Sequence, residues 1–169
     1  MHMNRPGGLH LFQEETMSVF SNILCCINLS EYPDDVAQYV NDIIKQNSAA
    51  LTVMRVAPCS QEVVRRSASL EFGTLVKEHQ QQNNDVFIKY VKEHFDGEPN
   101  IVLAEGNVED EVLRVIDKYC ADLVIIGSMS TKGLFGRWLN RSSESIIGKT
   151  RVPVLVIPNE LSLECTPNF

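Results

Sequence analysis

The sequence of 169 residues lacks a long apolar run, since no stretch approaches the roughly 18 residues that a membrane-spanning helix needs. It also lacks an excess of positive charge, because 15 Lys and Arg face 22 Asp and Glu and leave a net charge of −7. A chain this acidic is not expected to bind nucleic acid or an anionic membrane through its overall charge. We therefore expect a cytoplasmic globular protein with neither of these partners.

Cysteines at metal-binding spacing are missing as well. The five cysteines include no C-x2-C pair, and Cys25 and Cys26 are adjacent in a run of strand length. Adjacent strand residues point to opposite faces of a sheet, so these two thiols cannot bind one metal ion together. We expect no metal site and interpret the cysteines as small apolar core residues in a reducing cytosol, with a redox role left open for Cys59 or Cys165.

Several catalytic signatures of α/β proteins are also absent. The chain has no G-x-S-x-G elbow, no Walker loop, no G-x-G-x-x-G turn after its first apolar run and no S-G-G-x-D-S pyrophosphatase loop. A phosphorylated receiver domain would carry paired acids after that run, where this chain has Asn28 and Leu29. No catalytic residue is predicted, and whether the chain is an enzyme stays open.

What the chain does contain is a regular alternation of apolar runs and helical patterns. Strands are predicted at residues 22–29, 50–56, 100–104, 123–126 and 154–157. Strand, helix and strand follow one another without hairpin turns, which is typical of βαβ units and parallel pairing. The predicted fold class is α/β, as one domain with a five-stranded, mainly parallel, doubly wound sheet and helices on both faces.

Three of the intervening segments have clear helical patterns. The first begins after Pro33, and its apolar stripe is Val36, Tyr39, Val40, Ile43 and Ile44. The second spans residues 67–95, with a predicted inner face of Leu70, Leu75, Val76, Phe87, Tyr90, Val91 and His94 or Phe95. The third is predicted to start at the cap Asn107, with Glu109, Asp110 and Glu111 in its first turn and a buried stripe of Val108, Val112, Val115, Ile116 and Tyr119.

A basic segment follows the fourth predicted strand, which ends at Gly127. Residues 128–151 contain one acid, Glu144, and five bases: Lys132, Arg137, Arg141, Lys149 and Arg151. Open α/β sheets bind their ligands at the carboxyl ends of the strands. An anion is therefore the expected ligand at this end of the strand.

The segment from Ala121 to Pro158 resembles the C-terminal signature of the universal stress protein family, G-x2-G-x9-G-(S/T) followed by a P-V-L-V-V-P-like strand. Gly127 matches the first glycine, whereas Ser130, Asn140 and Arg141 replace the second glycine, the third glycine and the hydroxyl residue. The strand from Val152 to Pro158 also fits. Residues 23–31, 51–56 and 105–127 are similar to earlier blocks of the family, so the resemblance covers about residues 20–160.

The resemblance implies strand order 3-2-1-4-5, with a switch point between the first and fourth strands. In nucleotide-binding members an aspartate after strand one and the backbone after strand two hold adenosine, and the glycine loop receives the phosphates. The corresponding tentative nucleotide-binding residues here are Asn28, Val56, Gly127, Ser130, Asn140, Arg141, Ser142 and Ser143. Asn28 is uncharged, and Ser130 and Asn140 lack the backbone freedom of glycine. The resemblance therefore implies a degenerate pocket that binds ATP, ADP or AMP weakly or not at all.

Two functions remain open. The first is a cytosolic stress-response or regulatory protein that acts as a homodimer paired through the last strand, from Val152 to Pro158. The alternative is an ATP- or AMP-binding switch, or a slow ATPase, of the same family. A dedicated hydrolase is not expected because no Mg²⁺-holding carboxylate cluster accompanies the basic loop. Around the domain at residues 20–160, residues 1–19 are predicted to be a disordered extension or an expression remnant, and residues 161–169 a C-terminal tail.

Overall fold

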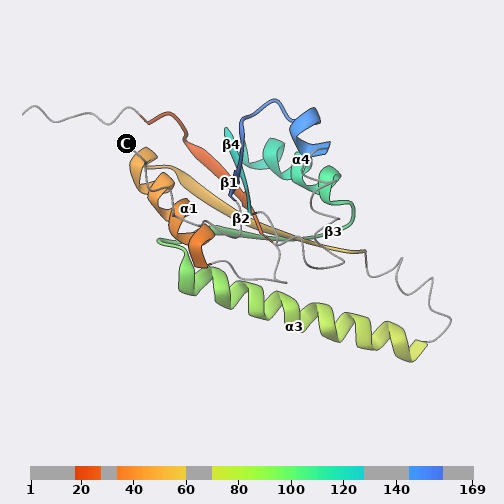
Figure 1. Ribbon diagram of the computed structural model, residues 1–169. Helices are drawn as coiled ribbons and strands as arrows, with labels where there is room; N and C mark the ends of the chain where they lie inside the picture. The colour runs from red at the N-terminus through yellow and green to blue at the C-terminus, as the bar shows by residue number, and fades with distance from the viewer. Residues whose placement is uncertain (1–17, 28–33, 60–69, 128–144, 158–169) are drawn as a thin grey trace, which may run out of the picture.

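The computed structural model describes residues 18–27, 34–59, 70–127 and 145–157. Its centre is a five-stranded sheet of order β3-β2-β1-β4-β5, in which every described strand pair is parallel (Figure 1). The strands are β1 (Asn22–Cys26), β2 (Ala50–Ala57), β3 (Asn100–Glu105), β4 (Leu123–Gly127) and β5 (Val154–Ile157). The predicted fold class, strand order and strand direction are confirmed.

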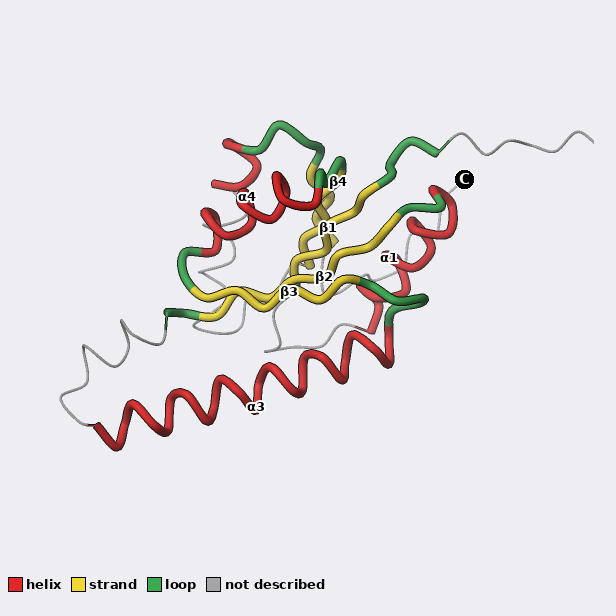
Figure 2. The backbone as a smooth tube through the Cα atoms, turned by 180° about the vertical axis from the view of Figure 1, so that it is seen from behind, coloured by secondary structure: helices red, strands yellow, loops and turns green. Residues whose placement is uncertain are grey.

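Helices cover both faces of this sheet. The long ones are α1 (Asp34–Asn47), α3 (Leu70–His94) and α4 (Val108–Tyr119). A further helical segment at residues 145–149, called helix 145–149 below, precedes β5. In Figures 1 and 2, α1 and α3 lie on one side of the sheet, and α4 lies on the other side with helix 145–149 beside it.

Strand residues alternate between two cores, one under each helical layer. The core on the side of α1 and α3 joins Ile23, Cys25 and Val53 to helix residues that include Val40 and Phe87. The opposite core contains Leu24, Met54, Val124, Ile126, Val112, Val115 and Ile146. All five residues of β4 are buried, as expected for a central strand that is covered on both faces.

The predicted inner faces of two helices are partly wrong. Tyr39 is 38% exposed and Leu75 is 61% exposed, whereas Ala37 is buried at 2%. Leu75 belongs to the N-terminal part of α3, which runs past the ends of the strands in Figures 1 and 2 and so has no sheet to pack against. The C-terminal part of α3 behaves as predicted, with Phe87 and Val91 fully buried.

The predicted start of α4 is confirmed. The side-chain oxygen of Asn107 accepts hydrogen bonds from the backbone N–H groups of Glu109 at 2.9 Å and Asp110 at 3.2 Å. The backbone of Asn107 is extended, as is usual for an N-cap residue. The three acids of the first turn interact favourably with the positive end of the helix dipole. Because β3 ends at Glu105, this cap also fixes where α4 begins relative to the carboxyl end of the sheet.

Side chains also hold the amino-terminal ends of the strands, on the side of the sheet opposite to their carboxyl ends. The Asp122 carboxylate accepts from the backbone N–H groups of Ser21 at 2.7 Å and Asn22 at 3.0 Å. The Asn47 amide oxygen accepts from the N–H groups of Val19 at 3.0 Å and of the next residue at 3.2 Å. The start of β1 is thus hydrogen-bonded to the last residue of α1 and to the residue that precedes β4. These contacts lie at the amino-terminal ends of the strands, opposite to the candidate ligand-binding end.

Candidate functional site

The candidate site is the carboxyl edge of the sheet where β1 and β4 lie side by side. The two strands are parallel and in register, with Cys26 opposite Ile126. From β1 the chain proceeds through β2 to β3 with helices on one face, whereas β4 leads to β5 with helix 145–149 on the other face. This reversal is the topological switch point at which open α/β sheets bind their ligands.

Gly127 is the last residue of β4 and is buried. A methyl group added at its Cα would lie 3.5 Å from Ile27 Cγ2 and 3.6 Å from both γ-carbons of Val36. These are ordinary van der Waals distances, so the described packing does not by itself demand a glycine here. The predicted role of Gly127 in admitting a phosphate group stays a prediction.

Val56 lies near the carboxyl end of β2, opposite Ala104 of β3. It is partly buried and packs against the core on the side of α4. The backbone N–H of Ile27 donates to the carbonyl of Met54 at 3.1 Å, so the β1–β2 ladder continues to the edge of the sheet. Val56 and Gly127 therefore stand on strands that flank β1 on either side.

Six of the eight predicted nucleotide-binding residues lie outside the described part of the chain. They are Asn28, Ser130, Asn140, Arg141, Ser142 and Ser143. Their placement beside Val56 and Gly127 remains a prediction. Cys165 lies outside the described residues as well.

A polar cluster at this edge was not anticipated from the sequence. The carboxylate of Glu109, on the first turn of α4, accepts hydrogen bonds from Ser145 Oγ and Lys149 Nζ of helix 145–149. Hydrogen bonds from Lys149 and Ser145 lower the pKa of Glu109, and the same contact raises the pKa of Lys149, with a smaller contribution from Asp110. Ser145 and Lys149 are four residues apart, and this spacing places both side chains on one face of a helix. The spacing is the feature of the sequence that could have indicated a common partner.

The adjacent thiols of β1 point into opposite cores, as predicted. Cys25 is fully buried in the core on the side of α1, and Cys26 packs against the core on the side of α4. Burial raises the pKa of Cys25 well above its usual range and that of Cys26 to about 12. Among the described residues no group of three or more His, Cys, Asp and Glu is placed to hold a metal ion. Nor is any described helix both long and apolar enough to cross a membrane.

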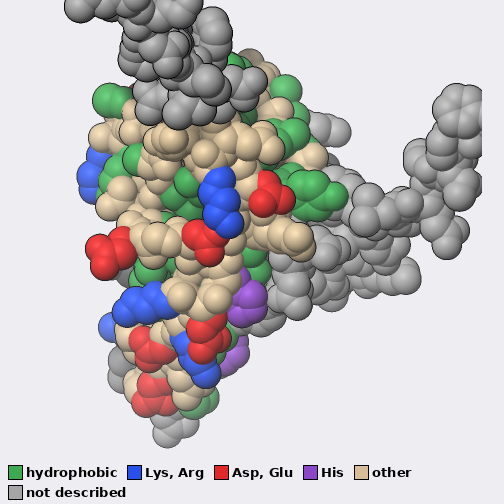
Figure 3. All heavy atoms as spheres, turned by 90° about the vertical axis from the view of Figure 1, so that its left-hand side faces the viewer, with side chains coloured by type: hydrophobic (Ala, Val, Ile, Leu, Met, Phe, Trp, Pro, Cys, Tyr) green, Lys and Arg blue, Asp and Glu red, His purple; other side chains and the backbone are tan. Residues whose placement is uncertain are grey.

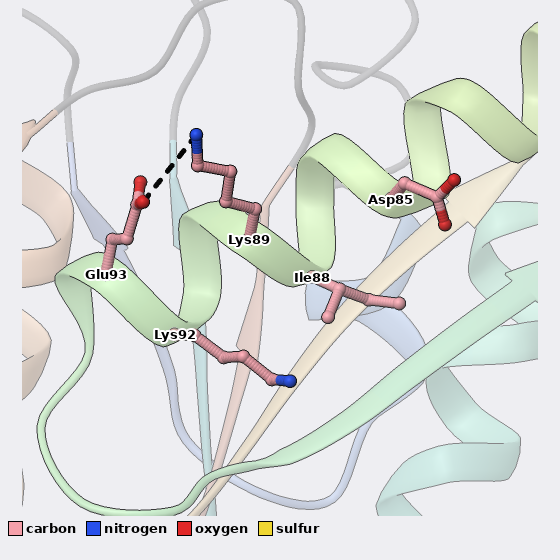
Figure 4. A pocket seen from close by; sticks show the side chains of 5 residues that line it. All are labelled: Asp85, Ile88, Lys89, Lys92 and Glu93. Atoms are coloured by element: carbon pink, nitrogen blue, oxygen red, sulfur yellow. Dashed lines mark ion pairs between the residues drawn. The ribbon is translucent and has the colours of Figure 1, made fainter.

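A surface hollow lies along α3, away from the switch point. Its lining residues are Asp85, Ile88, Lys89, Lys92 and Glu93, all from one helix (Figure 4). Lys89 and Glu93 form an exposed ion pair with an N–O distance of 3.8 Å. Among the described residues on the face shown in Figure 3, basic and acidic side chains are likewise mixed. Because Asp85 and Glu93 accompany the two lysines of the hollow, we do not propose an anion site there.

Comparison with known proteins identifies this arrangement. The sequence model of the Universal stress protein family matches residues 20–158. No match is found among curated proteins. Solved structures with the same fold include universal stress protein UspA from Lactobacillus plantarum, which is 16% identical with a TM-score of 0.60 over 81% of this chain and 97% of that one.

Two further structures agree on the fold. One is a protein from the universal stress protein family from Burkholderia pseudomallei, 17% identical with a TM-score of 0.53 over 85% of this chain and 98% of that one. The other is a universal stress protein in complex with cAMP, 13% identical with a TM-score of 0.53 over 83% and 98% of the two chains. Since the family model spans most of the sequence, the chain belongs to the universal stress protein family.

Proposed function

We propose that the chain is a cytosolic stress-response or regulatory protein that acts as a homodimer and has a degenerate adenine-nucleotide pocket. The observation that carries the proposal is the set of replacements in the family signature. Ser130, Asn140 and Arg141 stand where the signature has glycine, glycine and a hydroxyl residue, and Asn28 stands where nucleotide-binding members have aspartate.

The replacements act against phosphate binding for physical reasons. A non-glycine residue in a left-handed conformation costs about 1 kcal/mol, and its Cβ keeps the backbone N–H groups further from a ligand. Asn28 can still accept a hydrogen bond, but it does not give the charge-assisted bond of an aspartate. Two such changes in one loop weaken binding by roughly one to two orders of magnitude.

The alternative is an ATP- or AMP-binding switch, or a slow ATPase, at the same eight residues. One observation favours it: a solved universal stress protein of the same fold is in complex with cAMP. The basic segment after Gly127 also provides cations for a phosphate group, Arg141 among them. Under this alternative Arg141 pairs with the phosphate group.

Isothermal titration calorimetry of two proteins separates these functions. One is the natural chain and the other is a variant with Asn28→Asp, Ser130→Gly, Asn140→Gly and Arg141→Ser, which restores the family signature. We expect the variant to bind ATP at least about tenfold more tightly than the natural chain. Equally tight binding by both proteins would show that the replaced positions do not limit the affinity and would favour the alternative.

The proposed dimer uses β5, which is an edge strand with β4 on one side. Leu155 is 39% exposed and Val156 is 43% exposed, on opposite faces of this strand. An exposed apolar edge strand invites pairing with another strand. A second copy of the chain, presenting the same edge, would cover these side chains on association.

A further inference from the structure

Glu109 connects two elements that are distant in sequence. Its partners Ser145 and Lys149 follow it by 36 and 40 residues. One carboxylate oxygen takes the Ser145 hydroxyl and the other takes the Lys149 ammonium, so both oxygens are engaged. The glutamate side chain is only 16% exposed, whereas the lysine side chain is 61% exposed.

The cluster of Glu109, Ser145 and Lys149 lies at the carboxyl ends of the strands, the same end of the sheet as the candidate site. α4 starts directly after the carboxyl end of β3, and helix 145–149 follows the segment that begins at Gly127. Ile146 is buried at 1% in one core with Ile126 and Val112, which packs helix 145–149 against α4. Figures 1 and 2 both show the two helices side by side.

The donors held by Glu109 are the kinds that bind phosphate. A hydroxyl and an ammonium group donate strong hydrogen bonds to anionic oxygen atoms, whether these belong to a carboxylate or to a phosphate. Glu111, in the same turn of α4, instead pairs with Arg114 of its own helix at 2.6 Å. Of these two glutamates, Glu109 is the one that accepts hydrogen bonds from donors of the basic segment, Ser145 and Lys149.

We propose that Glu109 is an internal anion that occupies Ser145 and Lys149, and that a phosphate group at the carboxyl edge competes with it for these donors. The contact is therefore autoinhibitory toward phosphate ligands. This inference rests on the proposed function, because it supplies a second cause of weak nucleotide binding besides the loop replacements. It predicts that neutralising Glu109 strengthens phosphate binding, which a purely structural tie between two helices would not do.

The test uses inorganic tripolyphosphate as the probe, titrated calorimetrically into the full chain at low ionic strength. Glu109→Gln is expected to bind the probe about tenfold more tightly than the natural chain. Glu111→Gln is the matched control, since it makes the same charge change in the same turn, and it should bind as the natural chain does. Equal or weaker binding by Glu109→Gln, or an equal gain in Glu111→Gln, would overturn the proposal.

Two further variants make the test specific. Adding Lys149→Gln to Glu109→Gln should abolish the gain, because the released ammonium is then missing; a gain that survives contradicts the proposal. If Glu109→Gln does not fold, Glu109→Asp retracts the carboxylate by one methylene group and should show a gain in the same direction. Tight ATP binding by the natural chain would contradict the degenerate pocket but not the competition between Glu109 and phosphate. An unchanged tripolyphosphate affinity in Glu109→Gln would contradict that competition but not the degenerate pocket.

Discussion

The cysteines show how the position of a residue in the fold determines its reactivity. Cys25 and Cys26 are neighbours in sequence, yet they belong to separate cores, and burial keeps both thiols protonated. Their burial could be predicted because a continuous apolar run marks a covered strand. The exposure of Cys120 could not be predicted, because it depends on the left-handed backbone conformation of this residue, with φ of 50°, at the end of α4.

Thiol labelling tests this difference between the cysteines. Only thiolate reacts with iodoacetamide, so we expect Cys120 to be alkylated in the native protein while Cys25 and Cys26 stay unmodified. Peptide mapping by mass spectrometry after a short reaction at neutral pH measures this, with urea-unfolded protein as the control in which all sites react. Native labelling of Cys25 as fast as that of Cys120 would contradict the buried placement.

The Glu109–Lys149 pair gives stability a defined pH dependence. The lowered pKa of Glu109 means that its contribution is complete above the ordinary value of 4.5 and is lost as the pH falls through the lowered pKa. The raised pKa of Lys149 means that its contribution is present below 10.5 and is lost as the pH rises through the raised value. The stability difference between the natural chain and Glu109→Gln should therefore be largest between these limits.

Urea unfolding of both proteins at neutral pH and at a series of acid pH values below the ordinary pKa of 4.5 measures this difference. We expect the natural chain to be the more stable at neutral pH, and the gap to close in acid. Glu111→Gln serves as the control for a change of one charge in the same helical turn. A gap that stays constant down to acid pH would show that the Glu109 contact does not depend on ionisation.

Among the elements, α4 could be predicted almost completely and α3 only in part. The start of α4 is encoded locally, by Asn107 and the acids that follow it. The exposure of Leu75 on α3 is set by where the helix runs beyond the sheet, and a helical pattern carries no such information. The contact of Glu109 with Ser145 spans 36 residues and two elements, so periodicity could not reveal it either.

Removing the Asn107 cap tests the local account of α4. Asn107→Ala leaves two backbone N–H groups of the first turn without their acceptor and is expected to lower the free energy of unfolding by about 1 kcal/mol. Asn107→Ser keeps a capping oxygen and should retain most of that stability. Chemical denaturation of the three proteins measures the effect, and equal midpoints for the alanine variant and the natural chain would count against the cap.

At the scale of the whole molecule, the strand order came from the resemblance to the family, because hydrophobic patterns identify strands without ordering them. The observed order places β5 and β3 at the two edges of the sheet. The predicted dimer uses only the β5 edge. Leu155 on β5 and Leu103 on β3 are similarly exposed, at 39% and 40%, and so form a matched pair for testing this choice.

Size-exclusion chromatography with light scattering distinguishes the two edges. At micromolar concentration we expect the natural chain and Leu103→Asp to have twice the monomer mass of 19.0 kDa. Leu155→Asp should elute as a monomer, because a charge at the pairing edge opposes association. A natural chain that is monomeric, or a dimer that survives Leu155→Asp and not Leu103→Asp, would contradict the β5 interface.

We propose that this member of the universal stress protein family has kept the fold and lost most of the affinity for adenine nucleotides. Calorimetric titration of ATP into the natural chain tests the claim directly. We expect a dissociation constant of about 100 µM or weaker. A dissociation constant below about 1 µM would contradict it and would assign the chain to nucleotide binding.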